Sequence, residues 1–191
     1  MLMNRIIGAF TFRRGVYAEV EKDQAFTTTA WILVIVVAFL NQLGSSASPS
    51  LAAWGIETVL GTIGAVIAFA AATFVVQLLG RIIFHADVTY GETVRTLGLA
   101  YVWQVIGLIG AVKVFSEALS CVLAPALFIA WILALIAWLV AAKEDLDLEW
   151  VPTIVTVIIG WIVLAAITFA FGVAGWVLFV LILEAVGMVL G

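Results

Sequence analysis

The sequence predicts an all-α fold: a polytopic transmembrane bundle of about five helices, preceded by an amphipathic N-terminal helix. Of the 191 residues, 66% are hydrophobic and 10% are charged, whereas soluble domains are about half apolar. The mean hydropathy is +1.30. Five separate apolar runs approach the roughly 20 residues that cross about 30 Å of hydrocarbon. This composition excludes a soluble enzyme, and a net charge of −4 without a basic stripe argues against nucleic acid as a partner.

Residues 1–26 form a segment that we expect to be cytoplasmic and amphipathic. Apolar residues recur at spacings of three and four over residues 4–22, which is typical of a helix lying on a surface. Arg5, Arg13 and Arg14 lie among them, where they would approach anionic lipid head groups at the membrane surface. This helix either sets the topology alone or forms a docking surface for a cytoplasmic partner.

Residues 27–171 form the predicted membrane domain. Its spans run approximately over residues 27–43, 58–79, 97–115, 121–142 and 151–171. If the N-terminus is cytoplasmic, seven of the eight Lys and Arg residues lie in cytoplasmic segments and only Lys113 lies outside. Because cations are retained on the cytoplasmic side, we expect a multi-pass protein with a cytoplasmic N-terminus, located in a prokaryotic cell membrane.

Residues 172–191 form a C-terminal apolar segment that we expect to be broken or re-entrant. Glycines stand at 172 and 175, and one straight helix over 151–190 would measure about 60 Å, twice the hydrocarbon thickness. A short sixth span is the alternative. Glu184 is ionisable within this apolar run, and residues 144–191 contain no Lys or Arg. Glu184 is therefore either an intramembrane ion site or an interfacial residue.

The loop before the third span and the loop before the fifth carry most of the polar residues. Thr89 and Glu92 have the spacing of a capping box, which predicts a helix start. His85 is the only histidine and a weak candidate ligand for a porphyrin-type pigment; a hydrogen-bonded interfacial histidine is the alternative. The acidic run at 143–150 lacks the turn glycine of a calcium loop, so we expect a solvated loop. We predict no metal or cofactor and, because known catalytic motifs do not occur, no enzymatic activity.

Small residues form a ridge along the second span. They recur at helical spacing, which lets another helix approach closely. The ridge consists of Gly61, Gly64, Ala65, Ala68 and Ala72. Its partner is either another span of this chain or another subunit. Gln77 and Gln104 are expected to form hydrogen bonds between helices.

The stretch that leads into the third span has a G-x-x-x-x-x-x-G-x-A-Y pattern. In and beside this pattern we single out six residues as part of a cytoplasmic loop: Tyr90, Gly91, Glu92, Arg95, Gly98 and Tyr101. With five close-set spans and the run Lys-Glu-Asp-Leu-Asp-Leu at 143–148, residues 5–171 resemble the Ypt/Rab-interacting-protein (Yip) domain family. The resemblance implies a polytopic membrane protein, linked in eukaryotic members to Rab GTPases and vesicle traffic.

Three functions follow as hypotheses. The first is a Yip-like membrane scaffold or accessory subunit of a larger membrane complex, without catalytic activity, whose partners are the lipid bilayer and other membrane subunits. The second is a small transporter or ion-coupled permease that uses Glu184, Gln77 and Gln104. The third is a subunit of an electron-transfer or light-harvesting complex that contacts pigment or quinone through His85 and the eight tryptophans.

Overall fold

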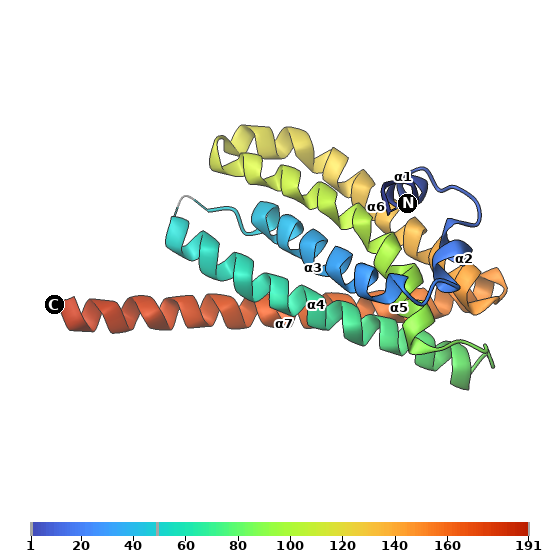
Figure 1. The fold of residues 1–191 in the computed structure, drawn as a ribbon. Coiled ribbons are helices and arrows are strands. Elements are labelled where there is room, and N and C mark those ends of the chain that lie inside the picture. The colour runs from blue at the N-terminus through green and yellow to red at the C-terminus, as the bar shows by residue number, and fades with distance from the viewer. Residues whose placement is uncertain (1, 49, 191) are drawn as a thin grey trace.

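The protein is an all-helical bundle, as predicted (Figure 1). A computed structural model describes residues 2–48 and 50–190, without the side chains of residues 117, 118, 120, 178, 179 and 182–190. Within this part of the chain, five helices are long and apolar enough to cross a membrane. These spans are Phe26–Ser45, Leu51–Ile82, Tyr90–Val114, Cys121–Leu146 and Trp150–Val177. The prediction of a five-span integral membrane protein is therefore confirmed.

The N-terminal segment is two short helices, so the prediction of one helix over residues 4–22 is wrong. Helix α1 covers Leu2–Phe10 and helix α2 covers Val16–Glu21. Between them the backbone of Phe12 has a φ of 49° and that of Gly15 a φ of 75°. A right-handed helix cannot continue through left-handed backbone, so the chain turns here.

The spans form two groups. Helix α4 (Leu51–Ile82) packs along α7 (Trp150–Leu190) in the most extensive interhelical contact. Helix α3 (Phe26–Ser45) and helix α6 (Glu117–Leu146) both pack on the 3-10 helix η1 (Tyr101–Val114). Contacts between α3 and α4 join the two groups, whereas α6 and α7 touch over a much smaller area.

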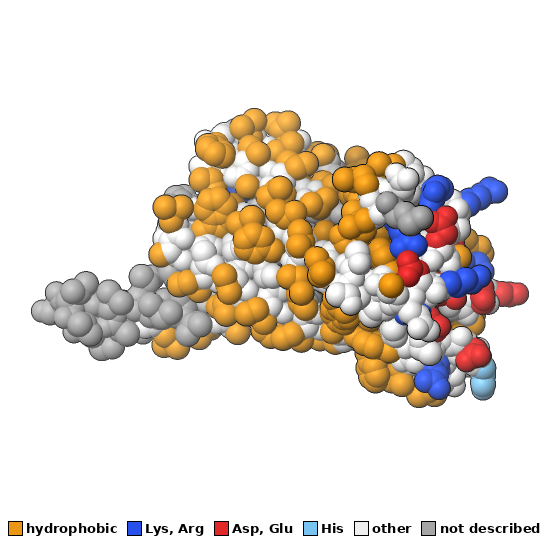
Figure 2. Space-filling model, viewed as in Figure 1, with side chains coloured by type: hydrophobic (Ala, Val, Ile, Leu, Met, Phe, Trp, Pro, Cys, Tyr) orange, Lys and Arg blue, Asp and Glu red, His pale blue; other side chains and the backbone are white. Residues whose placement is uncertain are grey.

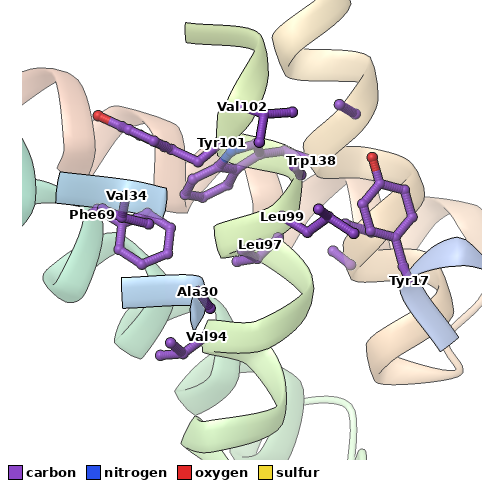
Figure 3. Packing of buried hydrophobic residues seen from close by; sticks show 14 of the residues in the cluster. Tyr17, Ala30, Val34, Phe69, Val94, Leu97, Leu99, Tyr101, Val102 and Trp138 are labelled. Atoms are coloured by element: carbon purple, nitrogen blue, oxygen red, sulfur yellow. The ribbon is translucent and has the colours of Figure 1, made fainter. Parts of the chain in front are cut away.

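Aromatic rings join the two groups in the buried core. Phe69 of α4 is fully buried, and the rings of Trp31, Tyr101 and Trp138 meet it edge to face at centroid distances of 5.7, 5.3 and 5.9 Å. These partners belong to α3, η1 and α6. Figure 3 shows Phe69, Tyr101 and Trp138 in this cluster, with Tyr17 of α2 on its other side. Four spans therefore meet at one ring.

The third span changes helix type along its length. Helix α5 (Tyr90–Ala100) begins with the predicted capping box, which is confirmed: Glu92 N donates to Thr89 Oγ1 at 3.4 Å and Thr89 N to Glu92 Oε2 at 2.7 Å. The residues that we placed in a cytoplasmic loop, from Tyr90 to Tyr101, lie instead in α5 and at the start of η1, so the loop ends at Thr89, where the predicted helix begins. The 14 residues of η1 continue the span, although 3-10 runs rarely exceed about four residues.

Helix α7 runs without a break from Trp150 to Leu190, so the predicted interruption at 172–175 is wrong. A glycine inside a helix costs about 1 kcal/mol relative to alanine and does not by itself end the helix. The 41 residues span about 61 Å, and Figure 1 shows the C-terminal end of α7 extending beyond the other helices. Neither a re-entrant segment nor a separate sixth span is present in the described backbone.

Charge is segregated along the bundle. Figure 2 shows Lys, Arg, Asp and Glu side chains gathered at one end, with hydrophobic side chains over the rest of the visible face. We call this the charged end. It contains α1, α2, the loop from α4 to α5 and the loop from α6 to α7.

Candidate functional site

Helix α2 is held at both of its ends by charged side chains, one buried and one partly buried. At its C-terminal end, Arg95 of α5 is only 6% exposed. Its Nε donates to Val20 O at 3.1 Å and to Glu21 O at 2.9 Å, and its Nη2 also donates to Glu21 O. The terminal carbonyls of a helix have no partner within the helix and carry its negative end. The Arg95 guanidinium donates hydrogen bonds to these carbonyls and places a positive charge at the negative end of α2.

At the N-terminal end of α2, Glu144 of α6 supplies the opposite charge. Its carboxylate accepts hydrogen bonds from Gly15 N at 3.3 Å and from Ala18 N at 3.1 Å. Arg95 also donates to Thr27 Oγ1 at 3.1 Å, which ties the same assembly to α3. We call Arg95, Glu144 and Thr27 the α2 clamp. It joins α2 to three spans of the bundle.

Helix α1 is fastened beside α2. Arg5 donates to Asp23 Oδ2 at 2.7 Å and lies over the ring of Phe26 at 5.1 Å. Trp103 of η1 donates from Nε1 to Ala9 O at 3.3 Å, and its ring stacks on Phe12 at 5.5 Å. The N-terminal segment is therefore packed on the bundle through both polar and aromatic contacts.

Burial and neighbouring side chains shift the pKa values of three titratable groups around the clamp. Burial raises the pKa of the Tyr17 hydroxyl, and the charge of Glu144 raises it further. Burial also raises the pKa of Glu21, with nearby Asp147 acting in the same direction. The hydrogen bond from Arg5 lowers the pKa of Asp23. Folding therefore favours the ionised form of Asp23 and disfavours that of Glu21.

Asp145 lies next to the clamp, but no described residue donates to it. It is 5% exposed, and neither carboxylate oxygen has a hydrogen-bond partner. The hydroxyls of Thr93 and Thr96 lie beside it, yet both donate to main-chain carbonyls of α5. The charged groups that act on it are Glu21 and Glu92, which are both acidic. Asp145 is thus a buried acid without a compensating donor or cation.

A second region of interest lies farther from the charged end, where α6 and α7 separate. Three hollows of about 620, 460 and 330 Å³ meet there. Gln104 and Trp131 line both the largest and the smallest hollow, Thr168 lines the largest and the middle one, and Asn41 lines the middle and the smallest. Asn41 Nδ2 donates to Gln104 O at 2.7 Å. These shared residues show that the three hollows adjoin one another between the two helix groups.

The small-residue ridge packs against other helices of this same chain. Gly64, Ala65, Ala68 and Ala72 are buried on α4. A Cβ added to Gly64 would lie 2.5 Å from Cβ of Phe171 on α7. Gly61 instead faces the side chain of Gln42 on α3. The ridge therefore serves helix packing inside the bundle, mainly against α7.

The remaining predicted site residues are dispersed. His85 is exposed, with a φ of 58°, in the loop from α4 to α5. The described residues contain no group of His, Cys, Asp and Glu side chains arranged to hold a metal. Gln77 is buried and donates to Val88 O at 3.4 Å. Glu184 lies in α7, and its side chain is outside the described residues.

The arginines predicted at the membrane surface and the residues predicted in the cytoplasmic loop make the following contacts. Arg13 pairs with Glu19 at 2.9 Å and Arg14 is exposed, whereas Arg5 is turned inward to Asp23. In α5 and η1, Tyr90 donates to Ala70 O, Gly91 lies beside Arg95, Gly98 packs on Ala30, and Tyr101 is buried against Phe69.

Several residues of these two regions were not singled out from the sequence, among them Thr27, Asn41, Trp131, Glu144, Asp145, Trp161 and Thr168. We placed Glu144 and Asp145 in a solvated loop, which is wrong, because α6 continues through them to Leu146. The sequence could have indicated this position. If the helix that begins near residue 121 is continued without interruption, it turns both carboxylates back towards the bundle. Asn41 lies four residues before an uncharged turn, and nothing in its neighbourhood marks it.

Comparisons with known proteins add no assignment. No family model, no curated protein and no solved structure matches this chain.

Proposed function

We propose that the protein is a non-catalytic membrane scaffold or accessory subunit that holds a partner protein at its charged end. The observation that carries the proposal is the α2 clamp. Burying the Arg95 guanidinium is costly unless its hydrogen bonds are well made, and a helix that only anchors the chain to the membrane does not require it. Here both ends of a six-residue helix are fixed to the spans. Fixed geometry is what a docking surface requires.

The surface that the clamp orients has features suited to a protein partner. Leu2, Met3 and Ile7 are exposed apolar residues on α1. Arg14 and Lys22 are exposed nearby in sequence and would provide a charged rim. An apolar centre with a polar rim is the usual composition of protein interfaces. The excess of Lys and Arg at this end supports a cytoplasmic orientation for it.

A site-specific cross-linking experiment tests the proposal. A photo-reactive residue at Ile7 in native membranes is expected to give a discrete protein adduct that saturates with expression level. The matched control is Val122, which is also apolar and exposed but lies near the end of α6 away from the charged end. The variant Arg95→Gln should reduce the Ile7 adduct while the protein remains inserted. Lipid adducts alone at both positions would refute the scaffold function.

The described residues give less support to the other two hypotheses. Gln77 is already committed to a main-chain carbonyl of this chain, so it does not face a transport path. His85 lies in an exposed loop away from the tryptophans of the core. A scaffold with Yip-like topology thus remains our proposal.

A further inference from the structure

Asp145 lies near the C-terminal end of α6, where this helix packs on α5 and α2 (Figure 1). It is 5% exposed, and both of its carboxylate oxygens are buried without a hydrogen-bond partner in the described part of the chain. An ionised carboxylate is costly in such a place, whereas a protonated carboxyl carries no charge and costs much less. Burial therefore favours the form of Asp145 that holds a proton.

The two hydroxyl groups beside Asp145 can accept a hydrogen bond from a protonated carboxyl. Thr93 and Thr96 of α5 are fully buried, and their hydroxyls lie next to the carboxyl. The Thr93 hydroxyl donates to Thr89 O at 3.3 Å, and the Thr96 hydroxyl donates to Thr93 O at 3.1 Å. Because their hydrogens are engaged, the two hydroxyl oxygens offer Asp145 only lone pairs. A protonated Asp145 can donate to one of them, whereas an ionised Asp145 brings a third acceptor group to a place without a donor.

The charged side chains around Asp145 also disfavour its ionised form. Glu21 of α2 and Glu92 of α5 act on it, and both are acidic. The nearby cations are directed elsewhere, since Arg95 of α5 donates to the end of α2 and Lys143 of α6 donates to a main-chain carbonyl beyond the helix. The remaining charged residues of α6, of the loop that follows it and of the adjoining end of α4 are exposed or bonded to α2: Arg81, Glu144, Asp147 and Glu149. Repulsion by two carboxylates thus adds to the cost of burial.

We propose that Asp145 is a proton-binding site that controls how firmly α2 is held. With a proton, Asp145 donates to a hydroxyl of α5, and the three helices pack together. Without the proton, its carboxylate repels Glu21 and loosens the C-terminal end of α2. The proton is exchanged with water at the charged end, so the step needs no other reactant. This inference concerns the position of α2 and does not depend on the scaffold function.

The packing also sets the direction of the pH dependence. In the packed protein, Asp145 keeps its proton at pH values above about 4, at which an aspartate in water is ionised. When α2 loosens, the carboxyl reaches water and releases the proton. Loosening of α2 therefore becomes more favourable as pH rises, by up to about tenfold per pH unit, until the packed protein itself loses the proton.

Amide hydrogen exchange of α2, measured on the whole chain in nanodiscs, tests this pH dependence. The matched variant is Asp145→Asn, which keeps the shape of the side chain and has no proton to release. The ratio of wild-type to variant opening of α2 should rise by at least about tenfold between about pH 5 and pH 8. Taking the ratio at each pH removes the pH dependence of exchange itself and the contribution of Glu21, whose pKa is also raised by burial. A constant ratio would overturn the proposal.

Infrared spectroscopy detects the bound proton directly. At about pH 6 an aspartate in water is only about 1% protonated. The wild type should show the carbonyl band of a protonated carboxyl at this pH, and Asp145→Asn should remove it. The control Asp87→Asn, which changes an exposed aspartate of the loop from α4 to α5, should keep the band.

The other spectroscopic outcomes are equally decisive. A band that disappears in Glu21→Gln but survives in Asp145→Asn would assign the proton to Glu21 and refute the site. A wild-type spectrum without the band at about pH 6 would do the same, and this measurement needs no variant, so the test remains available if Asp145→Asn does not fold.

Discussion

Replacing Arg95 by methionine is the most direct test of how the charged end is built. The substitution keeps an unbranched apolar side chain and removes the guanidinium. It leaves Glu21 O and Thr27 Oγ1 without their donor, whereas Val20 O still accepts from Asp23 N at 3.2 Å. A hydrogen bond to a charged group contributes about 1.5–3 kcal/mol, and the carbonyls at the end of α2 are partly able to reach water once the helix loosens. The loss of two such bonds, partly replaced by water, therefore predicts a decrease of about 2–4 kcal/mol in the free energy of unfolding.

Two assays report this loss separately. Unfolding in mixed detergent micelles, followed by circular dichroism, gives the change in the free energy of unfolding. Limited trypsin digestion at Arg13 and Arg14 reports whether the N-terminal segment has left the bundle. The control is Lys22→Met, which removes an exposed cation that makes no hydrogen bond to a described residue and should change neither result. A loss below about 0.5 kcal/mol with unchanged proteolysis would show that α2 is held by apolar packing and that the clamp is incidental.

Three further outcomes are expected. Asp145→Asn should keep or raise stability in the same unfolding assay, because both carboxylate oxygens lack partners; a loss above about 1 kcal/mol would reveal a donor that the structure does not show. Gly64→Leu should destabilise the contact of α4 with Phe171 by about 1–3 kcal/mol, whereas Gly55→Leu, with open space around it, should not; equal effects would contradict close packing at Gly64. The hydrogen bond from Arg5 lowers the pKa of Asp23, so the stabilisation by this ion pair is complete above the ordinary pKa range and is lost as pH falls below about 4; amide hydrogen exchange of α1, measured relative to α3, that does not increase in acid would argue against the pair.

The membrane architecture could be predicted from the sequence because hydrophobic runs of the required length have few alternative structures in lipid. The capping box at Thr89 was also predictable, since its two side chains are three residues apart and the motif needs no distant part of the chain. Helix ends were less predictable. The apolar run of α6 ends near Ala142, but the helix continues to Leu146 because Glu144 and Asp145 face other helices.

The candidate sites depend on contacts between distant parts of the chain, and the sequence pattern does not contain them. Arg95 bonds to residues 74 and 75 positions earlier, and Glu144 to amides more than 120 positions earlier. A charged residue in a polar stretch is ordinarily solvated, so its burial becomes visible only when α2 is seen to lie on it. The free donor of Trp161 is likewise a property of its neighbours: eight tryptophans have the same indole N–H, and packing decides which remains without an acceptor.

The 3-10 helix η1 connects the α2 clamp with the hollows between α6 and α7. Gly44 of α3 packs against the backbone of Gly107 and Gly110 in η1, so closely that a Cβ on Gly44 could not be accommodated. Helix α6 follows η1 through a short turn and packs on it, so this contact draws α6 towards α3. Helix α7 is held on the other side by the ridge of α4. Close glycine contacts therefore assign α6 and α7 to different helix groups, in line with the small area over which the two helices touch each other.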